Sequence, residues 1–160
     1  MPNSAKHQMD VLQSVVTSTL SAWRGTSVVK AAVQPKKRLK LYDMEGCPSC
    51  RRVREVLTAL GLDAEIYPCP KRGKRFRPEV ARQGSKRPVP LLVDPNTSTR
   101  LYEAQDIVDY LFKTYAGRDT PFAYTKGVLA PVLGQVGSLV RGMRGTMARK
   151  ANHPKKLLDL

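Results

Sequence analysis

Two cysteines that are spaced to act together stand in the run Cys47-Pro48-Ser49-Cys50. At the N-terminus of a helix, free backbone N–H groups and the positive end of the helix dipole favour the thiolate form of the first cysteine in such a motif. A thiolate attacks disulfides, and a second cysteine one helical turn along can attack the resulting mixed disulfide and release the reduced product. We therefore predict that Cys47 is the nucleophile and that Cys50 resolves the intermediate.

The same spacing occurs in zinc sites, which need two further ligands. His7 and His153 lie near the two ends of the chain, Cys69 stands alone, and the sequence contains no second Cys-X-X-Cys. Because the motif lies between a strand pattern and a helix pattern, we favour redox chemistry and expect no metal.

The elements around the motif are predicted to hold it at one edge of a sheet. Residues 39–42 have the pattern of a buried strand, and residues 51–60 have that of an amphipathic helix, with Pro48 suited to its first turn and Gly61 to its end. A second strand at residues 64–67 completes a parallel βαβ unit. Cys69, which follows this strand, is expected at the same edge as Cys47.

The chain after Cys69 predicts the remaining elements of a small α/β layer. A short helix is expected near residues 78–83, a strand within residues 87–97, a hairpin partner at 99–102 and a helix at 103–115 that ends at Gly117. The predicted fold class is α/β, a thioredoxin-like (glutaredoxin) four-stranded mixed sheet with flanking helices and extra N- and C-terminal helices.

The composition is strongly basic, with a formal net charge of +15 and a pI near 10.1. Such a chain attracts anions, and we expect an anionic membrane surface or an acidic protein as a candidate partner. The basic stretch at residues 71–87 contains one aromatic residue, Phe76, so we do not expect nucleic acid. Three cysteines make no disulfide framework, and no apolar run spans a bilayer, so we expect a cytoplasmic protein, with an organelle or peripheral membrane association as alternatives.

Both ends of the chain carry amphipathic helix patterns outside the predicted domain at residues 36–118. Within residues 1–35, apolar side chains recur at helical spacing, and we expect this stripe to pack on the domain, with an organelle transit peptide as the alternative. The basic tail at residues 119–160 is predicted to form a helix over residues 124–150 that packs on the N-terminal helix. A membrane surface or a dimer interface is the alternative for the tail, and the sequence does not indicate the oligomeric state. The apolar residues that define these two helix patterns are Met9, Leu12, Val16, Leu20 and Trp23 at the N-terminus and Leu129, Val132, Val136, Leu139, Val140, Met143 and Met147 in the tail.

Residues 38–117 resemble the thioredoxin fold in its glutaredoxin form and also the N-terminal glutathione-binding domain of glutathione transferases. Three features in this order carry the resemblance: Cys47-Pro48-Ser49-Cys50 after the first strand, Val89-Pro90 before the third, and the stretch from Tyr102 to Leu111 after the fourth. The order of the three features is much more specific than Cys-X-X-Cys alone.

The resemblance implies a glutathione site beside the dithiol, with glutathione as co-substrate. The Val89-Pro90 bond would be cis, and the Val89 backbone would pair with a bound thiol peptide. The start of the last helix would hold the γ-glutamyl end through Glu103 and a following Ser, but this chain has Ala104, which leaves a backbone N–H and the helix dipole for the carboxylate. Lys86 and Arg87 are candidates for the other carboxylate, and solvated surface positions are an equal interpretation.

Two functions follow from these patterns. The first is a glutathione-linked thiol–disulfide oxidoreductase, in which Cys47 attacks disulfides or glutathionylated proteins. The alternative is a thioredoxin-fold binding protein of low activity that docks through its basic surface and terminal helices to a membrane, nucleic acid or partner protein. Glutathione conjugation is not expected. In the transferases that this chain resembles, a following all-helical domain builds the substrate pocket, and only residues 118–160 remain here for one. A Ser or Tyr near the first helix commonly activates glutathione in those enzymes, whereas this chain has an intact dithiol.

Overall fold

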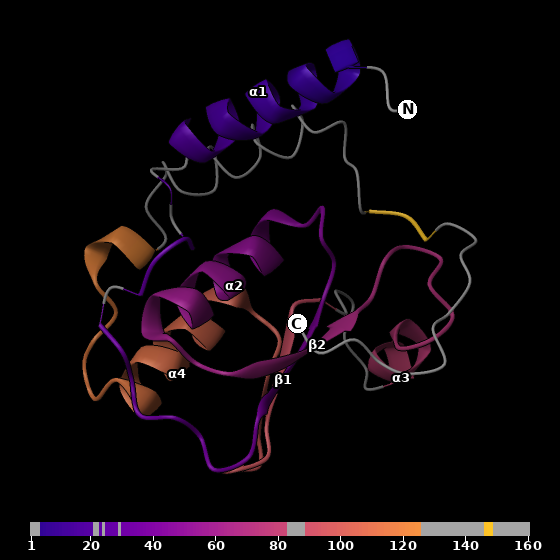
Figure 1. Cartoon of the computed structure of the whole chain (residues 1–160). Coiled ribbons are helices and arrows are strands. Elements are labelled where there is room, and N and C mark those ends of the chain that lie inside the picture. The colour runs from indigo at the N-terminus through magenta and orange to yellow at the C-terminus, as the bar shows by residue number, and fades with distance from the viewer. Residues whose placement is uncertain are drawn as a thin grey trace.

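The computed structural model describes residues 4–20, 23, 25–28, 30–82, 89–125 and 146–148. Its helices and strands follow the order α-β-α-β-α-β-β-α and a final 3-10 turn (Figure 1). They are α1 (Ser4–Leu20), β1 (Leu39–Asp43), α2 (Pro48–Leu60), β2 (Ala64–Pro68), α3 (Arg77–Arg82), β3 (Leu91–Asp94), β4 (Thr99–Leu101), α4 (Ala104–Tyr115) and η1 (Phe122–Tyr124).

The four strands form one mixed sheet in the order β2-β1-β3-β4. β1 runs parallel to β2, with Asp43 opposite Pro68, and antiparallel to β3, with Leu41 opposite Leu92. β3 and β4 form the predicted hairpin. The architecture is the predicted thioredoxin-like α/β fold, and the parallel β1–α2–β2 unit brings the ends of β1 and β2 to one edge.

Helices α2 and α4 cover one face of the sheet, and α3 lies on the other side (Figure 1). The apolar side chains of α2 and α4 recur every three or four residues, so each helix buries one stripe against the sheet. The core on this face includes Leu39, Leu41, Val53, Val56, Leu60, Leu92, Ile107, Val108, Leu111 and Phe112, all of them at most 1% exposed.

A smaller cluster lies on the opposite face, beneath α3 and the loop that precedes it. Its buried members are Tyr42, Cys69, Val80 and Leu91. Tyr67, Phe76, Val89, Val93 and Tyr102 are partly buried against them. This cluster joins the segment after β2 to the segment before β3, two parts of the chain that both border the end of β1.

The ends of α2 are those that the sequence predicts. Pro48 occupies the first helical position, where its missing N–H removes no helical hydrogen bond. Gly61 adopts the left-handed conformation (φ 63°) that ends the helix, and its N–H bonds to the carbonyl of Thr58. The local sequence therefore fixes where the helix that follows the dithiol begins and ends.

The N-terminal segment contacts the domain through residues that follow α1 and not through the stripe on α1. Ala32 N–H donates to Leu60 O (2.8 Å), and Val33 N–H donates to Tyr115 O (3.0 Å). On α1, Met9 is 71% exposed and Leu12 is 64% exposed. The expectation that this stripe packs on the domain is therefore wrong, since the hydrogen bonds of the following extended segment attach this part of the chain.

Most of the predicted tail helix lies outside the described residues. The described residues near its two ends are not α-helical: Tyr124 is the last residue of a 3-10 turn (Phe122–Tyr124), and Met147 forms a parallel bridge with Lys71. Lys71 N–H donates to Thr146 O (2.7 Å), and Ala148 N–H donates to Lys71 O (3.0 Å). At residues 146–148 the helix prediction is wrong, because backbone pairing with Lys71 replaces helical hydrogen bonds.

Candidate active site

The loop between β1 and α2 places the two motif cysteines at different depths. Cys47 is the N-cap residue of α2 and is half-buried, whereas Cys50 is 1% exposed. Cys47 N–H donates to Met44 O (3.0 Å), and Cys47 O accepts the first helical hydrogen bond from Arg51 N–H (3.0 Å). The backbone thus fixes Cys47 at the helix start, while Cys50 faces the interior one turn along. All three cysteines of the chain are free thiols.

The two thiols differ in acidity because they share a hydrogen bond. The Cys50 thiol donates to the Cys47 sulfur, and this bond, assisted by the backbone N–H groups of Cys50 and Ser49, lowers the pKa of Cys47 to about 6 against the opposing effect of burial. The same bond and burial raise the pKa of Cys50. At neutral pH, Cys47 is a thiolate and Cys50 keeps its proton, which is the division that a nucleophile and a resolving thiol require.

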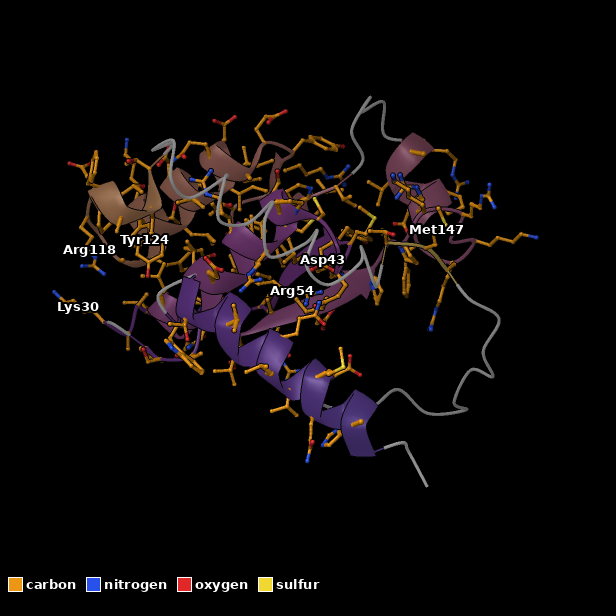
Figure 2. The ribbon with its side chains drawn as sticks, turned by 90° about the horizontal axis from the view of Figure 1, so that it is seen from above. Lys30, Asp43, Arg54, Arg118, Tyr124 and Met147 are labelled. Atoms are coloured by element: carbon orange, nitrogen blue, oxygen red, sulfur yellow. The ribbon has the colours of Figure 1, made fainter. Side chains whose placement is uncertain are left out.

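A buried acid that no sequence motif marks lies close to the dithiol. Asp43 ends β1, is fully buried and forms an ion pair with Arg54 of α2. Figure 2 shows these two side chains next to one another. Arg54 Nη1 also lies 2.5 Å from Glu45 Oε2. Burial raises the pKa of Asp43 against the opposing effect of Arg54, and the charge of Asp43 raises the pKa of both motif thiols.

One sequence signal could have located this pair. Arg54 follows Cys50 by four residues and therefore lies on the same helix face, which points toward the end of β1. Asp43 precedes Cys47 by four residues in a strand whose other end is apolar. A cation and an acid in these two positions meet only if α2 packs over β1.

Cys69 emerges at the edge predicted for it. Its N–H donates to Asp43 O (2.5 Å), directly beyond the Asp43–Pro68 pairing of β1 and β2. The side chain is fully buried, and burial raises its pKa to about 11. The structure thus places Cys69 next to the end of β1, the strand that leads into the motif, as a packed, protonated thiol.

The Val89-Pro90 segment approaches the same edge from the start of β3. The peptide bond between the two residues is cis, as the resemblance implies. Pro90 is buried, and Val89 packs against the cluster that contains Cys69. The cysteine motif, Cys69 and the Val89-Pro90 segment, which are widely separated in the sequence, therefore gather at one end of the sheet.

The comparisons with known proteins agree with this fold. Residues 41–119 match the family model described as glutathione S-transferase, N-terminal domain. These residues form a glutathione S-transferase N-terminal domain. A comparison of the whole chain with curated proteins finds no match. The family binds glutathione generally and is often enzymatic, which indicates a glutathione-related function for the domain.

The helix start that holds glutathione in such domains is formed here by Glu103 and Ala104. Glu103 is the exposed N-cap residue of α4, and its side chain makes no capping hydrogen bond. Ala104 is partly buried against the core. The side chain of Glu103 therefore does not cap the N-terminal N–H groups of α4. Lys86 and Arg87, the predicted partners of the second glutathione carboxylate, lie outside the described residues.

The arginines that follow the dithiol brace the glutathione S-transferase N-terminal domain. Arg52 Nη2 donates to Gln105 Oε1 (2.6 Å) and to Tyr124 O (2.7 Å), which connects α2 to α4 and η1. Arg51 pairs with Glu55 one turn along the helix (3.1 Å). Both side chains are engaged with protein groups, so they are half-buried structural residues and not solvated positions.

Two further features bear on the expectations from the sequence. In the part of the chain that the structure describes, no group of three or more His, Cys, Asp and Glu residues is placed to hold a metal ion. Over the same residues, no helix has both the length and the apolar character that crossing a bilayer requires.

Proposed function

We propose that this protein is a glutathione-linked thiol–disulfide oxidoreductase with Cys47 as the nucleophile and Cys50 as the resolving thiol. The observation that carries the proposal is the hydrogen bond from the Cys50 thiol that lowers the pKa of Cys47 to about 6. A pair of free thiols without this asymmetry would react slowly at neutral pH, since the thiolate is the reactive form.

In the proposed reaction, the Cys47 thiolate attacks one sulfur of a disulfide or of a glutathionylated protein, and the other sulfur leaves as a thiolate that takes a proton from water. The Cys50 thiol then loses its proton and attacks the Cys47 mixed disulfide. This step forms a Cys47–Cys50 disulfide and releases the second thiolate. Two glutathione molecules return the protein to the dithiol and leave as glutathione disulfide, so the substrate gains the two electrons that glutathione loses.

The site residues predicted from the sequence have separate roles in this proposal. Pro48 fixes the start of α2 behind the nucleophile. The Val89 backbone pairs with the backbone of the bound thiol, next to Pro90. Glu103 and the N–H of Ala104 hold the γ-glutamyl end of glutathione. Lys86 and Arg87 are proposed for its other carboxylate.

The test is turnover of a small glutathione mixed disulfide with glutathione, coupled to glutathione reductase. Cys47→Ser is expected to abolish turnover, and Cys50→Ser is expected to keep part of it, because glutathione itself can resolve the Cys47 mixed disulfide. Cys69→Ala serves as the control and is expected to leave turnover unchanged. If the wild-type dithiol is reduced and gives no turnover, the proposal is rejected in favour of the binding-protein alternative.

A further inference from the structure

A turn with four exposed cations follows Cys69 and Pro70. The cations are Lys71, Arg72, Lys74 and Arg75, called here the basic turn. Glu79 is the single acid between residues 70 and 82. Within the described residues, none of these four side chains forms an ion pair with the chain. Four like charges in five residues repel one another, so folding gains nothing from gathering them.

The backbone holds these cations in one conformation. Arg72 adopts the left-handed region (φ 63°), which is uncommon for a residue other than glycine. Gly73 N–H donates to Pro70 O (2.9 Å), and a side chain at Gly73 would meet that oxygen at 2.9 Å. The backbone of Lys71 pairs on both sides with residues 146–148. The basic turn is therefore an ordered structure that keeps a disfavoured conformation and unneutralised charge.

Aromatic residues connect the basic turn to the sheet. The guanidinium of Arg75 lies 4.6 Å from the ring centre of Phe76. Phe76 packs edge-on against Tyr67 (5.1 Å), and Tyr67 stacks on Tyr42 of β1 (4.7 Å). Arg77, which follows them, donates to Cys69 O (2.8 Å). These contacts thus attach the basic turn, through Arg75 and Phe76, to β1, the strand that leads into the cysteine motif.

The basic turn follows β2 and Cys47 follows β1, and these two parallel strands end at the same edge of the sheet. Cys69 N–H bonds to Asp43 O, and Cys47 follows Asp43 by four residues in a loop closed on Met44. In Figure 2, Met147, which bridges to Lys71, lies on the opposite side of Asp43 from Arg118 and Tyr124. The basic turn and Cys47 therefore follow the neighbouring ends of β2 and β1, and a polypeptide bound at Cys47 crosses the edge from which both emerge.

We propose that the basic turn binds acidic residues that flank the reacting sulfur of a protein or peptide substrate, so that Cys47 acts preferentially on acidic substrates. This inference rests on the proposed function, since it names the substrate class of the same site. Opposite charges steer encounter and raise association rates by about 10 to 1,000-fold at low salt. Screening at 0.15 M salt limits such attraction to about 8 Å, so the cations act on a bound substrate only where its chain passes over them.

The chemistry of the basic turn favours an acidic polypeptide over nucleic acid or lipid. Tyr67 and Phe76 are partly buried and packed on each other, so they offer no open platform for stacking bases. Residues 71–75 contain no apolar side chain that could enter a bilayer. The substrate of a thiol–disulfide exchange, in contrast, brings its own chain across the edge that carries Cys47.

The test compares three glutathionylated peptides of equal length whose single Cys is flanked by Glu, by Gln or by Lys. We expect kcat/KM to fall in the order acidic, neutral, basic, by about tenfold between the extremes at low salt, and the difference to shrink as salt is added. Arg72→Glu/Lys74→Glu is expected to reverse the order and to leave turnover of a small mixed disulfide unchanged. Loss of turnover for every substrate in the wild type would reject the proposed function instead.

The matched control is Lys36→Glu/Arg38→Glu, which changes the net charge equally. These exposed residues precede β1, at the end of the strand opposite Asp43. The control is expected to keep the preference for the acidic peptide. If both double variants lose the preference equally, net charge and not the basic turn is responsible, and the inference is overturned. Lys74→Gln, which retains Arg72 in its conformation, is expected to reduce the preference if the double variant fails to fold.

A binding measurement separates the surface from the redox reaction. A labelled acidic peptide without cysteine is titrated with the reduced wild-type protein, and fluorescence anisotropy reports binding. Arg72→Glu/Lys74→Glu is expected to weaken binding at least tenfold, and the control is expected to weaken it little. If the protein turns over the small mixed disulfide but does not bind the acidic peptide, this inference is overturned and the proposed function stands. Tighter binding of a single-stranded oligonucleotide or an anionic vesicle through the same residues would overturn the choice of an acidic polypeptide.

Discussion

The carboxylate of Asp43 pairs with Arg54 through one oxygen only, and its second oxygen, Oδ1, is buried without a hydrogen-bond partner in the described part of the chain. Asp43 is fully buried, whereas the Arg54 side chain is 37% exposed. An acid with an unsatisfied buried oxygen is costly unless its partner stays in place. The pair therefore links the end of β1 to α2 next to the dithiol and influences both stability and thiol acidity.

The first prediction concerns this acid and the nucleophile. Asp43→Asn is expected to lower the pKa of Cys47 further, because the negative charge of Asp43 disfavours the nearby thiolate. The pH dependence of Cys47 alkylation measures the change. Glu45→Gln, which removes an exposed acid that also contacts Arg54, is the control and is expected to have a smaller effect. An unchanged or raised Cys47 pKa in Asp43→Asn would contradict the electrostatic role.

The second prediction concerns the partner of this acid. Arg54→Met is expected to lower the free energy of unfolding by about 2 to 4 kcal/mol, since it leaves a buried carboxylate unpaired. Adding Asp43→Asn should recover part of the loss, because it removes that charge. Urea unfolding of the two single variants and the double variant measures both effects. Additive losses in the double variant would show that the two residues do not depend on each other.

The third prediction tests the shared hydrogen bond between the motif thiols. Cys50→Ala is expected to raise the pKa of Cys47 from about 6 toward the ordinary thiol value of 9.0, because the largest influence that lowers it is lost. In the wild type, reaction rates should fall about tenfold for each pH unit below 6, as the thiolate fraction falls. The rate of Cys47 alkylation, measured as a function of pH, reports both the pKa in the variant and the fall in the wild-type rate. Cys69→Ala should leave the Cys47 pKa unchanged, and a Cys47 pKa in Cys50→Ala that stays near 6 would refute the assignment.

The fourth prediction concerns a second buried acid, Asp94, at the end of β3. Burial alone would raise its pKa, but hydrogen bonds from the hydroxyls of Tyr110 (2.6 Å) and Tyr115, with those from Asn96, hold it below the usual value. As the pH falls, Asp94 is therefore protonated in the unfolded chain before it is protonated in the folded protein. The stability that Asp94 contributes is present above its ordinary pKa of 3.8 and is lost as pH falls through the folded value.

Tyr115→Phe is expected to lower the free energy of unfolding by about 1.5 to 3 kcal/mol at pH 7, the size of a hydrogen bond to a charged group. The loss should be smaller at pH 3, because the wild-type protein has itself lost part of the stability that ionised Asp94 contributes at that pH. Urea unfolding at the two pH values measures the difference. Tyr67→Phe, which removes a hydroxyl bonded to Glu65 on the edge strand, should cost less than about 1 kcal/mol. Equal losses for Tyr115→Phe at both pH values would exclude a role for Asp94 ionisation.

Much of the fold could be predicted from the sequence because its signals are local. Pro48 and Gly61 mark the ends of α2, and alternating or three-to-four-residue apolar spacing marks the strands of the sheet and α4. The position of Cys69 at the edge of the sheet that leads into the motif followed from the parallel connection of β1 and β2. The N-terminal helix was also predicted, but the prediction that its apolar stripe packs on the domain is wrong, because an amphipathic stripe does not say what covers it.

The candidate site was predicted only in part. The order of the Cys-X-X-Cys motif, Val89-Pro90 and Glu103 was enough to indicate the family, which the match at residues 41–119 confirms. Asp43 and Arg54 were missed, since a charged residue at a strand end and another on a helix are ordinary on a solvated surface. The contacts of Arg51 and Arg52 with neighbouring side chains are likewise not marked by any local pattern in the sequence.

By itself the sequence determined the dithiol, the order of the elements and the excess of positive charge, because each depends on residue types at fixed spacing along the chain. The tertiary structure alone decided that Asp43 is buried beneath the thiols, that residues 146–148 pair with Lys71, and that the basic turn stands at the edge that carries Cys47. Burial and hydrogen bonding depend on which distant segments pack together. These contacts set the acidity of a thiol and the surroundings of a charge, and no spacing along the chain specifies them.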